Sequence, residues 1–504
     1  MKTHEQMLRQ ILHQETRRHF LRQGSLALGS IWLASQARAG EQPAVALDLA
    51  HPMRPRAPLF APRARRVIYL HMAGSPSQLE LFDYKPELAR FDGKDCPASF
   101  LEGKTFAFIQ GIPKMLGPVY PFQQQGQSGT WMSDRWKYLP EVADELCVVK
   151  SLTTDQFNHG PAQLMMHSGS ANAGAPSFGA WTTYGLGSEN DNLPGFIVLN
   201  SGGKNPDAGK SVWGAGYLPS VFQGVQCRTR GEPVLFLSNP KGISSQLRRK
   251  TLDALAEINH QTASEIGDPE TLSRIAQYEL AFRMQTSAAE VFDISKETPG
   301  TLEAYGAAPG QESFANNCLL ARRLAENGVR FIQLFDWGWD HHGASEPESL
   351  SVGLTNKVNA VDRPITALIK DLRQRGLLED TLILWGGEFG RTPMQENRNG
   401  LPMAFPGRDH NPGAFTMWMA GGGVRAGTSF GETDDLGYQA VIDKISVHDL
   451  HATLLHLLGF DHLRLTYPVS GVPQRLTNVT KPGSQVVSKL LDSVNGTSSE
   501  PRQT

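Results

Sequence analysis

Short, continuous apolar runs recur along the chain and constrain its fold more than any other feature. Most of them lack polar alternation, as expected for strands that are buried on both faces of a sheet. Helical patterns lie between several of the runs, which is typical of parallel strands joined by helices. We therefore predict an α/β protein with a mostly parallel sheet flanked by helices. The runs are 67–72, 146–152, 196–199, 234–237, 329–335, 381–385 and 415–419.

The segments around these runs suggest a domain organisation. Residues 40–65 are rich in Pro, Ala and Arg without an apolar period, which predicts a linker before a main domain over 66–491. Within that domain, apolar residues at helical spacing predict a helical insertion at about 243–327. Residues 492–504 are rich in Ser, Asn and Gln, and we expect a disordered tail there.

The first 39 residues have the pattern of a twin-arginine export signal. Arg17 and Arg18 precede a weakly apolar run at 24–34 and a small-x-small site at 37–39. An amphipathic first helix is the alternative interpretation. We expect the twin-arginine export machinery as a partner and a periplasmic or otherwise exported location. No later run approaches the roughly 20 apolar residues of a membrane helix, so no membrane contact is expected after cleavage.

Charge and cysteine content exclude some classes of function. The formal net charge of -2 gives no reason to expect nucleic acid as a partner. The four cysteines are widely spaced and form no CxxC pair, which argues against a cysteine zinc site and leaves a disulfide open. A P-loop and a GxGxxG pattern are also missing from the sequence.

Polar clusters lie next to the predicted strands, where ligands bind in an open α/β sheet. Three of the five clusters combine carboxylates with imidazole or amide nitrogen, the donors of zinc, manganese and iron sites. Asp340 and His342 are two residues apart, so in an extended segment both point to one side. Turn closure and helix capping are the alternative roles for such residues. The clusters are 71–78, 153–160, 336–343, 386–393 and 407–412.

These motifs together resemble the DUF1501 family, whose members are sulfatase-like proteins of the alkaline phosphatase superfamily. The resemblance spans 66 to about 491 and rests on the sequences at 74–78, 158–159, 338–342, 386–393 and 407–412. It implies an alkaline phosphatase-like sheet holding one or two divalent metal ions, with zinc, calcium or manganese expected. In that superfamily the ions clamp a phosphate or sulfate ester.

The resemblance also implies roles for individual residues. The expected metal ligands are Asp340, His342, Glu388 and His410, and the expected catalytic residues are Asn158, His159 and Arg391. Arg391 is expected either to bind an anionic substrate oxygen or to pair with Glu388. Asn158 and His159 are expected to bind metal or substrate, with local turn bonding as the alternative for Asn158.

The sequence also departs from the superfamily pattern. Ser75, Ser77 and Gln78 follow the first strand where an aspartate ligand is expected, and the nucleophile region offers Thr153 and Thr154 without a single candidate. The CxPxR signature of ordinary sulfatases is absent. We expect a periplasmic, metal-dependent hydrolase of sulfate or phosphate esters, with a carbohydrate as the expected carrier. The alternative is a catalytically degenerate, sulfatase-like binding protein.

Overall fold

The computed structural model describes residues 47–48, 51–228, 232–234, 238–266, 269–477 and 483–492. The predicted export signal and the tail beyond residue 492 lie outside these residues. The same holds for most of the apolar run at 234–237, of which only Val234 is described, in a bend.

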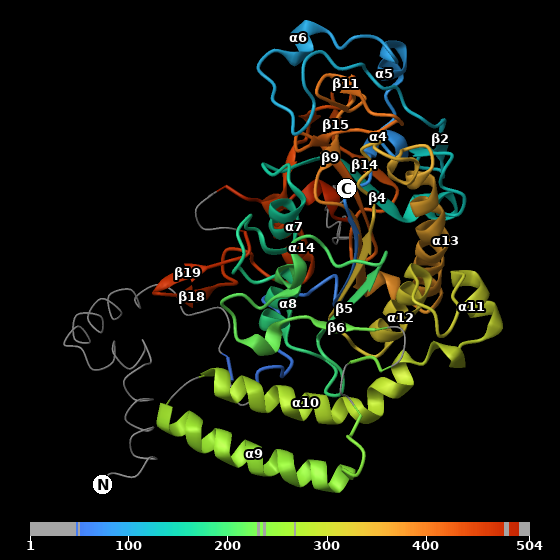
Figure 1. The fold of residues 1–504 in the computed structure, drawn as a ribbon. Helices are drawn as coiled ribbons and strands as arrows, with labels where there is room; N and C mark the ends of the chain where they lie inside the picture. Colours follow the sequence, from blue (N-terminus) through green and yellow to red (C-terminus); the bar gives the residue numbers. More distant parts are fainter. Residues whose placement is uncertain are drawn as a thin grey trace, which may run out of the picture. The chain divides into compact units, whose positions relative to one another are not determined.

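A central sheet organises the described part of the chain, and nine strands form it there. Its order is β14-β4-β13-β8-β1-β7-β5-β6, with β17 also paired to β4 (Figure 1). Six strands match predicted apolar runs, whereas the short strands β6, β14 and β17 were not predicted. The strands are β1 (Arg66–Ala73), β4 (Leu146–Thr153), β5 (Phe196–Ser201), β6 (Val225–Cys227), β7 (Phe331–Trp337), β8 (Thr381–Gly386), β13 (Phe415–Ala420), β14 (Thr428–Phe430) and β17 (Ile445–Ser446).

The directions of the strands bring several of the predicted polar clusters to the same edge of the sheet. Strands β1, β5, β6, β7 and β8 are mutually parallel, and β13 is antiparallel to both β8 and β4. β4 therefore runs in the same direction as β8. The carboxyl ends of β1, β4, β7 and β8 and the residues that precede β13 thus lie at the same edge. The prediction of a mostly parallel sheet is confirmed.

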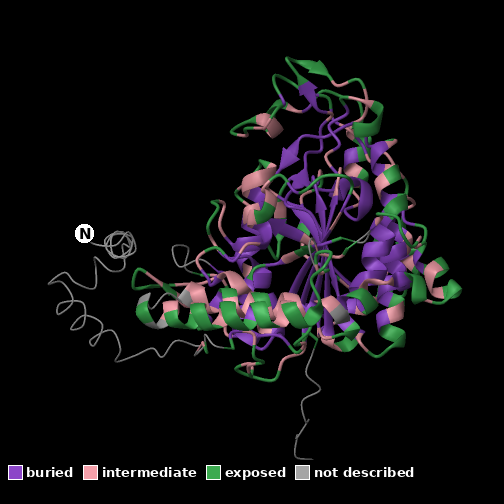
Figure 2. Cartoon of the chain, turned by 60° about the horizontal axis from the view of Figure 1, so that its bottom comes forward, coloured by how far each residue is buried: buried purple, intermediate pink, exposed green. Residues whose placement is uncertain are grey.

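Helices cover both faces of the sheet, and its strands are buried between them (Figures 1 and 2). One face packs against α12 and α13 through a large apolar core that includes Leu334 and Trp385. The other face carries α7, α8 and α14, with Phe178 against Phe331. The helices are α7 (His159–Ser168), α8 (Phe178–Leu186), α12 (Phe314–Glu326), α13 (Gly353–Gln374) and α14 (Val447–Leu457).

Two long helices, α9 (Ser245–Ile266) and α10 (Pro269–Phe292), pack against each other within the segment where a helical insertion is predicted (Figure 1). Residues 51–65, within the predicted linker, lie against the main domain. Leu59 donates its backbone N–H to Gly459, and the guanidinium of Arg56 donates to Tyr184. No helix in the described ranges is both long and apolar enough to cross a bilayer.

Candidate metal centre

Three histidines and one aspartate meet at the carboxyl edge of the sheet. His159 is the first residue of α7, which follows β4, whereas Asp340 and His342 follow β7. His410 lies on the short strand β12 (His410–Asn411), just before β13. One ligand atom from each of the four residues lies within 4.8 Å of the others. The structure thus brings together three predicted metal ligands and one predicted catalytic residue.

The three imidazole rings are held by acceptors at Nδ1. His159 Nδ1 lies 2.7 Å from Glu388 Oε1, and His410 Nδ1 lies 2.7 Å from the carbonyl oxygen of Phe157. His342 Nδ1 pairs with the buried carboxylate of Glu396. A carbonyl or carboxylate oxygen accepts only, so Nδ1 carries the proton in each neutral ring. Each Nε2 lone pair is then left for the centre of the cluster, as in metal-binding histidines.

Asp340 is the anion around which the rings gather. Its carboxylate oxygens lie 2.8 Å from His342 Nε2 and 3.3 Å from the Nε2 atoms of both His159 and His410. The Asp340 side chain is 33% exposed, so the cluster opens to solvent on one side. The buried Nε2 of His159 makes no hydrogen bond to any described residue. The donor set and this orphaned nitrogen fit a divalent cation with an open coordination position.

Arg391 holds Asp340 in place. Its guanidinium donates to Asp340 Oδ1 at 2.6 Å and to the backbone carbonyls of Gly74, Ser75 and Arg408. The side chain is 2% exposed and most of its N–H groups are used. The expected pairing with Glu388 is absent among the described contacts, since the carboxylate partner is Asp340. This geometry suits positioning of Asp340 better than direct binding of a substrate oxygen.

Burial and neighbouring charges shift the pKa values of Asp340, His159 and His410 in different directions. Burial would raise the pKa of Asp340, but Arg391 and the three histidines outweigh it and hold that pKa well below its usual value. Burial lowers the pKa of His159, but the neighbouring carboxylates of Asp340 and Glu388 raise it to about 9. Burial, aided by Arg391 and His159, lowers the pKa of His410 to about 3. His410 is therefore neutral at pH 7, whereas His159 is protonated in the metal-free cluster, and a cation bound at its Nε2 would have to displace that proton.

Glu388, predicted as a metal ligand, lies behind His159 rather than among the four clustered residues. Its Oε1 accepts hydrogen bonds from His159 Nδ1, from Gln163 Nε2 at 3.0 Å and from Gly74 N at 3.1 Å. Its Oε2 lies 3.2 Å from the fully buried His71 Nε2. Glu388 therefore contacts the cluster through His159 and fixes the orientation of that ring.

The polar residues after β1 support the segment that carries Glu388 and Arg391. Ser75 Oγ accepts from the backbone N–H groups of Glu388 and Phe389 at 3.1 and 3.2 Å. The Gln78 side-chain amide binds the backbone of Arg391 through both its nitrogen and its oxygen. Ser77 donates to Glu80. These side chains are used in protein contacts, at the place where an anionic metal ligand was expected.

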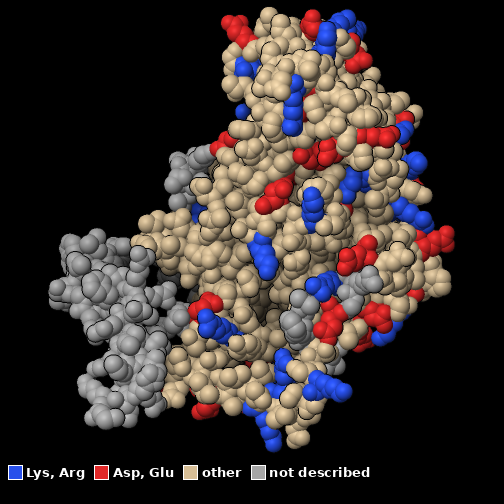
Figure 3. Space-filling model, in the orientation of Figure 1, with Lys and Arg blue, Asp and Glu red and all other residues tan. Residues whose placement is uncertain are grey.

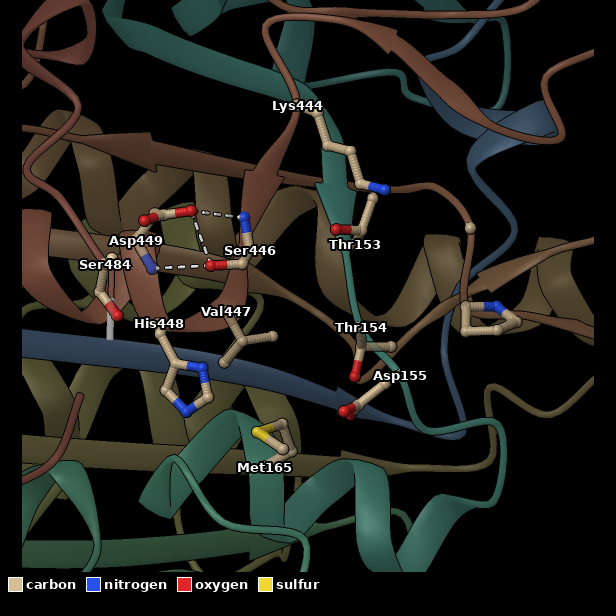
Figure 4. Close-up of a pocket in the computed structure, with 13 residues that line it drawn as sticks. Thr153, Thr154, Asp155, Met165, Lys444, Ser446, Val447, His448, Asp449 and Ser484 are labelled. Carbon is tan, nitrogen blue, oxygen red and sulfur yellow. Dashed lines mark hydrogen bonds between the residues drawn. The ribbon is translucent and has the colours of Figure 1, made fainter. Parts of the chain in front are cut away.

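Thr153 and Thr154, from the predicted nucleophile region, line a separate cavity of about 410 Å³ (Figure 4). Thr153 donates to the carbonyl oxygen of Ile445, and none of the four clustered residues lines this cavity. Asn158 is different, because it is exposed and occupies the N-cap position of α7 directly before His159, without a side-chain capping bond.

Sequence reasoning missed Glu396, the buried partner of His342. Nothing in the local pattern marks it, because it follows the cluster at 386–393 in a stretch without a strand or helix signal. His71 was in a predicted cluster, but its contact with Glu388 depends on the pairing of β1 with β8.

Fold and site together define an α/β protein with a candidate metal centre at the carboxyl edge of a mostly parallel sheet. The chain belongs to the family described as "Protein of unknown function (DUF1501)", whose model matches residues 64–491. No curated protein matches the chain at a significant level.

Several solved structures resemble the chain at low identity. PsFucS1 sulfatase from Pseudoalteromonas sp. is 11% identical, with a TM-score of 0.35 over 79% of this chain and 68% of that one. Alkaline phosphatase from the Antarctic bacterium TAB5 is 8% identical, with a TM-score of 0.31 over 79% and 99%. Ps i-CgsB in complex with k-i-k-neocarrahexaose is 10% identical, with a TM-score of 0.34 over 79% and 72%. At these TM-scores the likeness decides nothing about function.

Proposed function

We propose that the protein is a metal-dependent hydrolase of sulfate or phosphate esters that works after export to the periplasm. The observation that carries this proposal is the arrangement of His159, His342 and His410, whose Nδ1 atoms are all engaged and whose Nε2 atoms meet at Asp340. Three imidazoles and one carboxylate are a common donor set for zinc and manganese.

In this proposal, His159 replaces Glu388 among the ligands, which become His159, Asp340, His342 and His410. A bound divalent cation would supply Lewis acidity toward the ester oxygens. Glu388 keeps His159 in the tautomer that presents Nε2, and Glu396 does the same for His342. Because Asp340 has a pKa well below its usual value, it stays ionised throughout the neutral range.

The remaining catalytic candidates act around this centre. The exposed Asn158 amide and the N-terminal N–H groups of the ten-residue helix α7 bind the non-bridging oxygens of the ester. Arg391 acts as a positioning residue, because its contacts fix Asp340. No side chain is assigned as a nucleophile, so the proposal uses water as the attacking group.

A noncatalytic binding protein is the second candidate. The observation that favours it is the use of Ser75 and Gln78 as backbone supports, which leaves a single four-residue metal cluster among the described residues. Two-metal phosphoryl and sulfuryl enzymes clamp both the attacking and the leaving oxygen. A single ion would still bind an anionic ester but would give weaker catalysis.

Metal analysis combined with turnover separates these candidates. The purified protein is loaded with zinc or manganese, and hydrolysis of an aryl sulfate and an aryl phosphate is measured. The hydrolase proposal predicts one bound ion per chain and turnover that is lost on chelation and in His410→Ala and Asp340→Asn. His456→Ala, on α14, is the matched control and should retain both. Stoichiometric metal without turnover of either ester would favour the binding protein.

A further inference from the structure

A second, larger cavity lies on the same edge of the sheet as the candidate metal centre. It encloses about 890 Å³ and is lined by the loop after β5, the ends of β6 and β7, the first turn of α12 and the middle of α13. Asp336, at the end of β7, lines it and precedes Asp340 by four residues. Four residues span at most about 14 Å. The cavity wall at Asp336 is therefore at most about 14 Å from the backbone of Asp340, a separation that an extended ligand of several units could span.

Cations outnumber carboxylates in the lining of this cavity. Four basic side chains contribute to it, against the carboxylates of Asp336 and Glu312. Asp336 is already paired with Lys357 at 2.6 Å and accepts from Ser201 Oγ and Trp339 Nε1. Figure 3 shows a hollow in the face over β5 and β6 with Lys and Arg side chains beside it. The basic residues are Lys204, Arg228, Lys357 and Arg363.

Three of these cations lack a carboxylate partner within the described ranges. The Lys204 ammonium lies 4.2 Å from the ring centre of Trp337, which fixes its position without neutralising it. The Arg363 guanidinium donates only to the carbonyl oxygens of Glu303 and Ala304. No carboxylate of the described chain pairs with Arg228. The N-terminus of the 13-residue helix α12 adds a positive end to the same wall.

The rest of the lining suits a hydroxylated ligand. Asn200, Gln226 and Asn359 supply amide groups, and the buried Oδ1 of Asn200 has no hydrogen-bond partner among the described residues. An acceptor of this kind is satisfied by a ligand hydroxyl group. A neighbouring cavity of about 450 Å³ shares Gln226 and Arg228 with the first, so space continues around the edge strand β6.

We propose that this cavity binds the anionic oligosaccharide that carries the ester, through sulfate or carboxylate groups beyond the one at the metal centre. The assignment as part of a substrate site rests on the proposed hydrolase function, whereas binding itself does not require the metal. It predicts a preference for polyanionic glycans over isolated monoesters.

The test is calorimetric titration of the full chain with a sulfated carrageenan hexasaccharide, its desulfated form and a carboxylated oligogalacturonate. Wild-type protein should bind at least one anionic oligosaccharide at least tenfold more tightly than the desulfated one. That affinity should fall as added salt shortens the screening length from about 10 Å at 0.1 M to about 3 Å at 1 M. Lys204→Met/Arg228→Met should weaken binding at least tenfold. Lys241→Met/Lys250→Met removes the same charge elsewhere and should bind like wild type.

Three results would overturn the assignment: equal binding of charged and desulfated sugars, wild-type affinity in Lys204→Met/Arg228→Met, or preferential binding of oligothymidylate. Titrations in chelator and with Asp340→Asn separate this proposal from the hydrolase proposal. Unchanged sugar binding without any metal or turnover would contradict the hydrolase alone. Normal turnover with unaltered sugar binding in the double variant would contradict the cavity assignment alone.

Discussion

Replacing Gly74 by alanine tests the metal centre without touching a ligand. Gly74 has a φ of +104°, and an added Cβ would lie 2.7 Å from Asp340 N and 3.0 Å from Trp339 N. Relief to an ordinary contact of 3.4 Å requires the backbone at Asp340 to move by about 0.7 Å. Metal–ligand distances tolerate about 0.2 Å. We therefore expect zinc affinity to fall at least tenfold, which is about 1.4 kcal/mol.

Gly174→Ala is the matched control for this substitution. Gly174 has a φ of +107°, and an added Cβ there meets nothing within 4 Å. Both variants carry the backbone cost of an unfavourable conformation, about 1–3 kcal/mol, which chemical unfolding in chelator measures. Only Gly74→Ala should lose zinc affinity in competition with a chelating dye. Wild-type zinc affinity in Gly74→Ala would refute the placement of Asp340 in the site.

Three further predictions address charge, pH and export. Glu80→Gln leaves the fully buried Arg408 without its ion-pair partner and should lower the free energy of unfolding by about 3–5 kcal/mol in urea titration; a loss below about 1 kcal/mol would contradict this. Burial lowers the pKa of His451 from 6.5 to about 3, so the unfolded chain binds a proton first and stability falls as pH drops below 6.5. At pH 5 the free energy of unfolding should be about 2 kcal/mol lower than at pH 7 because of this group. Urea unfolding of wild type and His451→Gln at both pH values measures this loss, which His451→Gln should not show. Replacing Arg17 and Arg18 by lysine should hold the precursor in the cytoplasm, and normal periplasmic accumulation on fractionation would oppose the export prediction.

The fold was largely predictable because each buried strand leaves a continuous apolar run. The direction of a strand was not predictable in the same way, because the apolar run at 415–419 looks the same whether its strand is parallel or antiparallel. β13 proved antiparallel, and this direction brings His410 to the carboxyl edge. The short strands β6, β14 and β17 carry two or three residues each, too few for any periodic signal.

The residue types of the candidate site and its position at the carboxyl edge of the sheet could be predicted from the sequence. The contacts between its side chains could not. Asp340, His342 and His410 meet as expected, because strand ends that share an edge bring them together. Whether Glu388 or His159 joins them depends on side-chain direction at a loop residue and at the first residue of α7, which spacing along the chain does not define. The Glu396–His342 pair joins loops 54 residues apart and has no local signature.

The most direct test of a metal ion held by His159, Asp340, His342 and His410 is anomalous diffraction from crystals grown with zinc, recorded across the zinc absorption edge. We predict one anomalous peak inside the cluster, about 2.0–2.1 Å from the histidine Nε2 atoms and about 2.0–2.2 Å from an Asp340 carboxylate oxygen. An absent peak, or a peak bound by other residues while the cluster stays without metal, would contradict the account.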